Sequence, residues 1–436
     1  MREFPVETSI HTRQDTLKGY ARKNTCFVGE TILISYDKFF FGLEKSMHKK
    51  IMLNWQANNY FGWGLLGLNI FQRWAVDPDV QPLMGRPIGP ADVQAMDPLR
   101  MFAMGPAVIK SNTFLAGLIA DKTGAAAKDI IVVNGFGNRF GAAAAPHFKG
   151  RRTIARCVLE DTRVDNARQL LASHDDVLCA SSWSADILRA TSGKPVTMIY
   201  EGIDSSQFFP GPKSGVLDPS KFYVFSGGKI EFRKGHDLVL LAFREFAARH
   251  KEAVLVAAWH SPWPKGSVGF QGKLKSPLRM DARGVLDVKR WVTENGVDER
   301  QFLELPPTPN PLIPSILREM DCAVQVSRCE AATNLPAKEA MACGIPVILA
   351  NNTGARDLVG NKNCVALSAQ APVASNSVGT EGWGESSVEE IVAALEMLFT
   401  DSEFRKKIGA RGAQWIMDEG RTWGHHAAAL KSYLLT

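Results

Sequence analysis

The sequence predicts an α/β protein with two doubly wound, Rossmann-like domains that face each other across a cleft. Short apolar runs alternate with helical stretches from about Lys50 to the end of the chain, a pattern typical of parallel βαβ units. Residues 209–215 contain two prolines and two glycines, as linkers between domains often do. In such folds a ligand binds outside the carboxyl ends of the strands, so we expect the site in the cleft.

The first half of the chain contains short apolar or β-branched runs that we interpret as buried strands. These runs are 51–53, 130–133, 154–159, 177–180 and 196–200. Residues 65–74 predict an amphipathic helix, because their apolar side chains recur at helical spacing, and 184–190 predict a shorter helix. The alternation indicates one parallel sheet in this half.

The second half repeats the pattern with a clearer order. The predicted strands are 222–226, 254–259, 302–303, 322–327 and 347–349. The predicted helices are 237–249, 285–295, 334–343, 389–399 and 402–419. Gly344 follows the third of these helices, where a glycine commonly ends a helix, so 322–349 form a complete βαβ unit.

These patterns predict four parts of the chain. Residues 1–47 are an N-terminal extension to which we assign no role. Residues 48–208 form the first domain and 209–414 the second, which suits two domains of ordinary size. We expect 415–436 to form a C-terminal helix that packs back on the first domain.

Composition excludes several classes of protein. Apolar residues make up 45% of the 436-residue chain, so it can build full cores, and the net charge of +6 comes with no basic stripe for nucleic acid. No apolar run approaches the ~20 residues of a membrane span, and the N-terminus has no apolar signal region. Seven cysteines without a CxxC pair, and nine histidines without an HExxH, suggest neither disulfides nor a metal site. We therefore expect a cytoplasmic protein without a metal or other cofactor.

A first candidate binding segment follows the predicted strand 222–226. The sequence GGKIEFRKG places Gly228 in a turn and three cations, Lys229, Arg233 and Lys234, within six positions at the carboxyl end of a strand. Glycines let the backbone approach a diphosphate, and ammonium and guanidinium groups neutralise its charge. The alternative is a solvated basic turn.

A second candidate segment covers 327–347. We expect a helix to begin near Thr333, which is a plausible cap, so that free backbone N–H groups face an anion. Glu339 lies about one turn into this helix and could accept hydrogen bonds from ribose hydroxyls, and Glu330 could meet a sugar from the preceding loop. The alternative for both glutamates is a partner of the helix dipole or a surface charge.

The segments KIEFRKG and EAMACGIPVI resemble the family 4 nucleotide-sugar glycosyltransferases, which have the GT-B fold. The glycine-rich stretch 62–69 and the segment 200–210 are also similar to this family. The resemblance implies a retaining, metal-independent hexosyltransferase that moves a sugar from a nucleotide-diphosphate sugar to a hydroxyl. The acceptor would be a glycan, a lipid-linked group or a protein, in bacterial-type glycan or polysaccharide assembly, with at most weak membrane contact.

The resemblance also implies roles for single residues. Lys229 stands where the family usually has Arg; with Lys234 it would hold the diphosphate, and Glu330 would be the third catalytic residue. The family's first Glu falls in register with Ala331, so either a one-residue bulge brings Glu330 to the sugar or that role is vacant. The residues implied to bind the donor are Gly62, Gly64, Gly228, Arg233, Thr333, Asn334, Leu335 and Glu339.

Three residues at strand ends of the first domain are candidates for the acceptor side: Asn134, Glu160 and Asp161. The family's frequent histidine in this domain is missing here. For Glu160 and Asp161 the ordinary alternative is a capping or solvated pair.

Two other functions stay open on the sequence. The offset of Glu330 suggests a sugar-nucleotide-binding protein with impaired catalysis. Gly62, Gly64 and Gly67 form a GxGxxG pattern, which suggests an NAD(P)-dependent oxidoreductase. Six residues separate that pattern from the strand before it, and no acid ends the second strand, so the nicotinamide interpretation is the weaker one.

Overall fold

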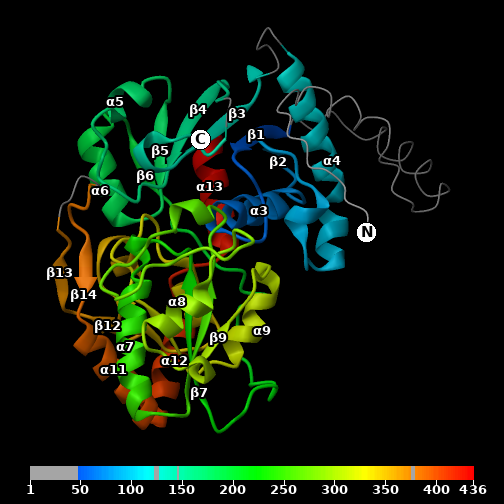
Figure 1. The fold of residues 1–436 in the computed structure, drawn as a ribbon. Coiled ribbons are helices and arrows are strands. Elements are labelled where there is room, and N and C mark those ends of the chain that lie inside the picture. The colour runs from blue at the N-terminus through cyan, green and yellow to red at the C-terminus, as the bar shows by residue number, and fades with distance from the viewer. Residues whose placement is uncertain (1–47, 122–126, 145–146, 375–378) are drawn as a thin grey trace, which may run out of the picture. The chain divides into compact units, whose positions relative to one another are not determined.

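The computed structural model describes residues 48–121, 127–144, 147–374 and 379–436, and Figure 1 shows these parts as a coloured ribbon. The predicted extension 1–47 lies outside the described residues. Two parallel six-stranded sheets carry the fold, with the orders β2-β1-β3-β4-β5-β6 and β12-β11-β10-β7-β8-β9. The sequence prediction of two doubly wound sheets is confirmed.

The first sheet contains β1 (Lys49–Asn54), β2 (Val80–Met84), β3 (Ile131–Phe136), β4 (Arg152–Cys157), β5 (Asp176–Cys179) and β6 (Val196–Met198). Its helices are α3 (Gly62–Trp74), α4 (Pro98–Ala120), α5 (Ala167–Leu170) and α6 (Ser182–Thr191). Pro82 sits in β2, an edge strand, where a missing N–H costs little.

The second sheet contains β7 (Phe222–Gly228), β8 (Ala253–Trp259), β9 (Phe302–Glu304), β10 (Cys322–Gln325), β11 (Val347–Ala350) and β12 (Val365–Leu367). A separate hairpin pairs β13 (Gln370–Pro372) with β14 (Gly384–Ser386). The helices are α7 (His236–Arg249), α8 (Val288–Glu294), α9 (Ile313–Arg318), α10 (Leu335–Ala342), α11 (Val388–Thr400) and α12 (Ser402–Asp418).

The start of α10 differs from the sequence prediction. Asn334 caps the helix, because its side-chain oxygen accepts a hydrogen bond from the N–H of Ala337 at 3.1 Å. Thr333, the expected cap, is buried, and its hydroxyl has no hydrogen-bond partner among the described residues. Asn and Thr both cap helices well, so sequence alone could not separate two adjacent candidates.

The last helix, α13 (Trp423–Leu435), packs against α3 and shares a core with it. The segment before it runs beside the chain that leaves the first sheet: the N–H of Ile203 donates to the carbonyl of Arg421 at 3.0 Å, and the N–H of Trp423 donates to the carbonyl of Ile203 at 2.9 Å. A Cβ at Gly202 would lie 2.1 Å from the carbonyl carbon of Thr422, so only glycine fits this crossing. Residues 48–436 form one compact unit, and the boundary at 208/209 stays a prediction.

Helix α4 packs on the edge strand β2 through one face and leaves an apolar face uncovered. Leu99 is 78% exposed, Phe102 74% and Ile109 69%. The sequence predicts no membrane-spanning segment, yet α4 is long and apolar enough to cross a membrane by length and composition alone. Because its other face covers β2, the helix can offer only its outer side to a partner.

Candidate functional site

A cavity of about 420 Å³ lies where the carboxyl ends of both sheets meet, and it contains most of the residues predicted from the sequence. The predicted residues that line it are Gly62, Glu160, Gly228, Lys229, Arg233, Lys234, Glu330, Asn334, Leu335 and Glu339. The prediction of a site in the cleft therefore agrees with the position of the cavity.

The three predicted cations reach the cavity from a tight turn after β7. Gly228 has a φ of +124° and Gly235 a φ of +69°, which favour glycine, and between them lies the 3₁₀ turn η4 (Phe232–Lys234). A Cβ at Gly235 would also lie 2.3 Å from the carbonyl oxygen of Val326, so the turn packs directly on the chain after β10. The glycines of this segment therefore shape the loop that carries the cations.

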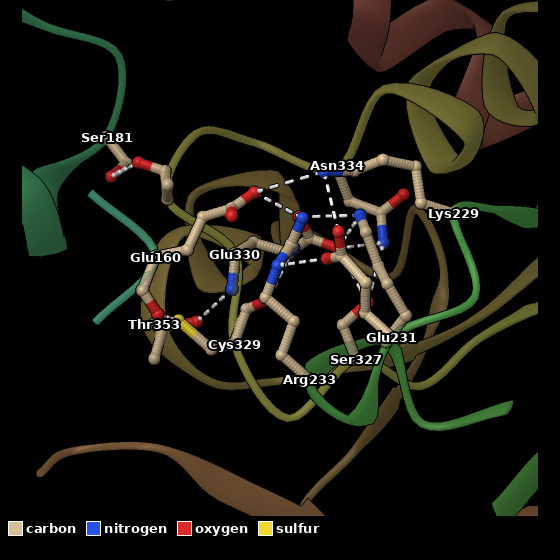
Figure 2. A network of polar contacts seen from close by, with 12 residues as sticks. Glu160, Ser181, Lys229, Glu231, Arg233, Ser327, Cys329, Glu330, Asn334 and Thr353 are labelled. Carbon is tan, nitrogen blue, oxygen red and sulfur yellow. Dashed lines mark hydrogen bonds and ion pairs between the residues drawn. The ribbon is translucent and has the colours of Figure 1, made fainter. Parts of the chain in front are cut away.

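Each of these cations is already paired with a carboxylate, and Figure 2 shows Lys229 and Arg233 among the carboxylates. Lys234 Nζ lies 2.7 Å from one Glu330 oxygen and 2.9 Å from the other. Arg233 contacts Glu330 at 3.4 Å and Glu231 at 2.9 Å. Lys229 Nζ lies 2.7 Å from Glu231. A diphosphate entering the cavity must compete with these carboxylates for the cations.

The pKa shifts of Glu231 and Glu330 favour the charged forms of these two carboxyls. Burial by itself would raise the pKa of Glu231, but Arg233 and Lys229 outweigh it and lower the pKa to about 2. Burial would likewise raise the pKa of Glu330, but Lys234 and Arg233 hold it below its ordinary value. Burial lowers the pKa of Lys234, and Glu330 opposes that shift.

Glu330 points into the cavity although it is one residue out of register with the family motif. Its carboxylate accepts hydrogen bonds from the hydroxyl of Ser327 at 2.6 Å and from the amide of Asn334 at 3.0 Å. The carbonyl of the next residue, Ala331, points to α6 instead. Of the two sequence alternatives, the loop geometry favours the one in which Glu330 faces the site.

Glu339 reaches the same cavity from the first turns of α10. Its Oε1 accepts a hydrogen bond from the side-chain amide of Asn310 at 2.6 Å. Burial raises the pKa of its carboxyl to about 7, and the bond from Asn310 only partly offsets this. Glu339 therefore changes its charge near neutral pH.

Glu160 contributes a carboxylate from the first sheet. It pairs closely with Arg233 across the cavity, and its own N–H donates to the side-chain oxygen of Asn138 at 2.6 Å. Arg139 and Phe140, next to Asn138, have φ values of 52° and 54°, which are strained for side chains of this size. Strained backbone at a cavity wall is typical of functional loops.

Asn134 and Gly64 lie outside the cavity, and this corrects the sequence analysis. Asn134 is buried between strands, where it accepts a hydrogen bond from the amide of Asn54 at 2.8 Å and donates to the carbonyl of Phe148 at 3.1 Å. A Cβ at Gly64 would lie 2.1 Å from the side-chain oxygen of Asn58. Both residues serve local packing.

Asp161 and Thr333 also do not line the cavity. Asp161 accepts a hydrogen bond from the N–H of Arg163 at 3.2 Å, which fits the ordinary capping alternative. Gly67 likewise packs against a side chain, because a Cβ at this position would lie 2.9 Å from the indole nitrogen of Trp55. Since Gly64 and Gly67 face side chains rather than the cavity, the nicotinamide interpretation loses its structural support.

Sequence reasoning missed several residues that line or shape the cavity. Glu231 lies inside the predicted cation segment, but its pairing with those cations has no sequence signature. His260 follows β8 directly, so its place at a strand end was a usable signal. Glu201 lies in the segment 200–210 that resembles the family, whereas Asn310 comes from a distant loop and carries no local signal. Among the described residues, no group of three or more side chains could hold a metal ion.

Comparisons with known proteins agree with this geometry. Residues 212–415 match the family model described as Glycosyl transferases group 1. The chain is similar to sucrose-phosphate synthase from Thermosynechococcus elongatus, with a TM-score of 0.59, 14% identity and coverage of 88% of this chain and 98% of that one. No curated protein matches the sequence.

Two further solved structures share the arrangement of the two sheets. HepE from Anabaena, in complex with UDP-glucose, has a TM-score of 0.59, 14% identity and coverage of 89% of this chain and 99% of HepE. A glycosyltransferase from Rickettsia africae has a TM-score of 0.57, 12% identity and coverage of 89% of this chain and 98% of that one. At these identities the likeness shows the fold, which is GT-B.

The charge of Glu339 gives a pH prediction. Its carboxyl ionises as the pH rises through about 7, and the carboxylate accepts hydrogen bonds from ribose better than the neutral acid does. We expect the affinity for a nucleoside diphosphate sugar to rise about tenfold from pH 6 to pH 8, in step with the ionised fraction. Isothermal titration calorimetry measures this, since the diphosphate diester does not titrate in that range.

The rise should disappear in Glu339→Gln. Glu304→Gln is a matched control, because burial also raises the pKa of Glu304 but that residue does not line the cavity. A Glu339→Gln protein that keeps the full pH dependence would refute the ribose role.

Proposed function

We propose that this chain, which has the GT-B fold and whose residues 212–415 match the family model of group 1 glycosyl transferases, transfers a sugar, with retention of configuration, from a nucleoside diphosphate sugar to a hydroxyl acceptor. The observation that carries the proposal is the set of three cations, Lys229, Arg233 and Lys234, at the end of β7 in the cavity between the sheets. We propose bacterial-type glycan or polysaccharide assembly as its context.

In the proposed reaction, the bond between the anomeric carbon and the diphosphate oxygen breaks, and the oxygen keeps the electron pair. The acceptor oxygen forms its new bond to the same carbon from the same face. The acceptor proton passes to the departing phosphate oxygen, so no protein base is required. Lys234 and Lys229 stabilise the charge that develops on the leaving group, as preorganised donors do in a desolvated site.

The carboxylates around the cations support an exchange of partners on donor binding. Lys234 is paired with Glu330, so a phosphate that takes Lys234 frees the Glu330 carboxylate. The freed carboxylate lies beside the amide of Asn334, at the cavity wall, where it can accept hydrogen bonds from sugar hydroxyls. Glu330 thus pairs with Lys234 before the donor binds, and it contacts the sugar once phosphate has taken its place at Lys234.

We propose that the donor is a uridine diphosphate sugar, so that its base is uracil. HepE, which shares the fold, binds UDP-glucose. In this chain His260 follows β8 and lines the cavity, where we propose that its ring contacts the base. We propose that the built-in cations make a metal unnecessary.

The direct experiment is a turnover assay in EDTA. UDP-glucose, GDP-mannose and ADP-glucose are each incubated with the protein and an alkyl glucoside acceptor, and the product anomer is determined by NMR. We expect turnover with UDP-glucose and an α-linked product. Loss of activity in EDTA that Mg²⁺ restores would contradict metal independence, and a β-linked product would contradict retention. Tight UDP binding without turnover of any donor would favour the impaired binding protein.

The cations give a sharper prediction. Lys234→Ala should lower kcat by about two orders of magnitude, as loss of one transition-state donor does. Lys229→Arg is the matched variant, and it should keep most activity because Arg also suits phosphate. Steady-state kinetics distinguishes the Lys234→Ala variant from the Lys229→Arg variant. Thermal denaturation checks that both variants are folded. Wild-type turnover in Lys234→Ala would remove the diphosphate assignment.

We also propose that the protein is cytoplasmic and touches an anionic membrane through α4. Leu99, Phe102, Pro106 and Ile109 recur every three to four residues on its exposed face, and residues 98–120 contain two basic side chains but no acidic one. A lipid-linked acceptor suits such a surface.

Cosedimentation with phosphatidylglycerol vesicles tests the membrane contact. We expect the protein to pellet with these vesicles, and the double variant Phe102→Ser with Ile109→Ser to stay in the supernatant. Val216→Ser is the control, since Val216 is as exposed as Leu99 but lies outside α4. Equal pelleting of both variants, or a dimer in size-exclusion chromatography that Phe102→Ser abolishes, would overturn the proposal.

A further inference from the structure

The loop that carries Glu330 is held from the opposite domain by two serines. Ser181 Oγ and Ser184 Oγ each donate a hydrogen bond to the carbonyl oxygen of Ala331, both at 2.7 Å. Ser181 and Ser184 are fully buried. Figure 2 shows Ser181 in the same polar network as Glu330. One carbonyl therefore receives two hydroxyl donors from the first domain.

The start of α6 makes this arrangement favourable. Ser181 caps the helix, since its Oγ accepts a hydrogen bond from the N–H of Ser184 at 3.2 Å. Residues three apart share one face of a helix, so both hydroxyls point the same way. The carbonyl of Ala331 also meets the positive end of the helix dipole.

A second element holds the same loop from the other side. In the 3₁₀ segment η8 (Thr353–Leu358), Thr353 Oγ1 accepts a hydrogen bond from the N–H of Glu330 at 2.8 Å, and the N–H of Gly354 donates to the carbonyl of Glu330 at 2.9 Å. A Cβ at Gly354 would lie 2.1 Å from the carbonyl oxygen of Ala332, so the contact is close. The backbone of Glu330 is thus held by η8, and the carbonyl of Ala331 is held by α6.

Helix α6 touches η8 separately, through a different serine. The N–H and the hydroxyl of Ser182 donate to the two carboxylate oxygens of Asp357, at 2.6 Å and 2.5 Å. Ser182 makes a domain contact without touching the Glu330 loop. The same helix therefore offers a contact that sets the loop and a contact that only joins the domains.

We propose that Ser181 and Ser184 are positioning residues that turn the Ala331 carbonyl away from the cavity and so aim Glu330 at Lys234. This inference rests on the proposed glycosyl transfer. It explains how a glutamate one residue out of register still reaches the site. Because the hydroxyls belong to the other domain, the donor loop takes its working shape only when the two domains are together.

Ser184→Ala tests the proposal and leaves the Ser181 cap in place. We expect kcat to fall about threefold to tenfold, as loss of one buried hydrogen bond does, while the donor KM changes less than twofold. Ser181→Ala with Ser184→Ala should lower kcat further, and Ser184→Thr, which keeps a hydroxyl, should restore it. Ser182→Ala is the matched control, and its kcat should stay at the wild-type value.

Hydrogen exchange by mass spectrometry provides a readout that needs no turnover. The amides of 327–334 should exchange faster in Ser184→Ala than in the wild type, and Ser182→Ala should leave them unchanged. This result stands even if the transfer assay fails, so the two proposals fail separately. The positioning role would be overturned if Ser184→Ala had the same kcat as Ser182→Ala and the same rates of amide exchange in 327–334.

Discussion

The buried ion pairs between Lys234, Arg233 and Glu330 are the constraint on which the site depends. A buried charge without a partner costs several kcal/mol, so these cations are tolerated only with carboxylates beside them. Glu330 supplies its charge from the loop before α10, and Glu160 supplies another from the first sheet. Under the proposed function, the protein's own carboxylates thus occupy the cations that a phosphate would contact.

Two connections tie the halves of the molecule together around this site. Backbone hydrogen bonds join Ile203 to the segment before α13, where the chain crosses, and Gly202 lets the two segments approach. The serines at the start of α6 form the other connection, directly on the donor loop. Both connections consist of hydrogen bonds: the first joins backbone to backbone, and the second joins two side-chain hydroxyls to one carbonyl.

The sequence predicted the local parts of this structure well. The GGKIEFRKG turn and the α10 segment depend on glycine conformation, strand ends and helix starts, which nearby residues determine. The pairing of Glu160 with Arg233 and the bond from Asn310 to Glu339 join residues far apart in the chain, and no local pattern encodes them. Asn134 was misassigned for the same reason: a strand-end asparagine looks alike whether it faces a cavity or a neighbouring strand.

The balance of charge in the cavity has a consequence for how a donor arrives. Lys229, Arg233 and Lys234 meet three carboxylates, so the cation segment presents no surplus positive field to the solvent. Long-range electrostatic steering, which speeds the approach of anions to unpaired basic clefts, is therefore weak here. Under the proposed function, capture of the donor depends on random encounter followed by exchange of carboxylate for phosphate, and we expect its rate to respond little to ionic strength.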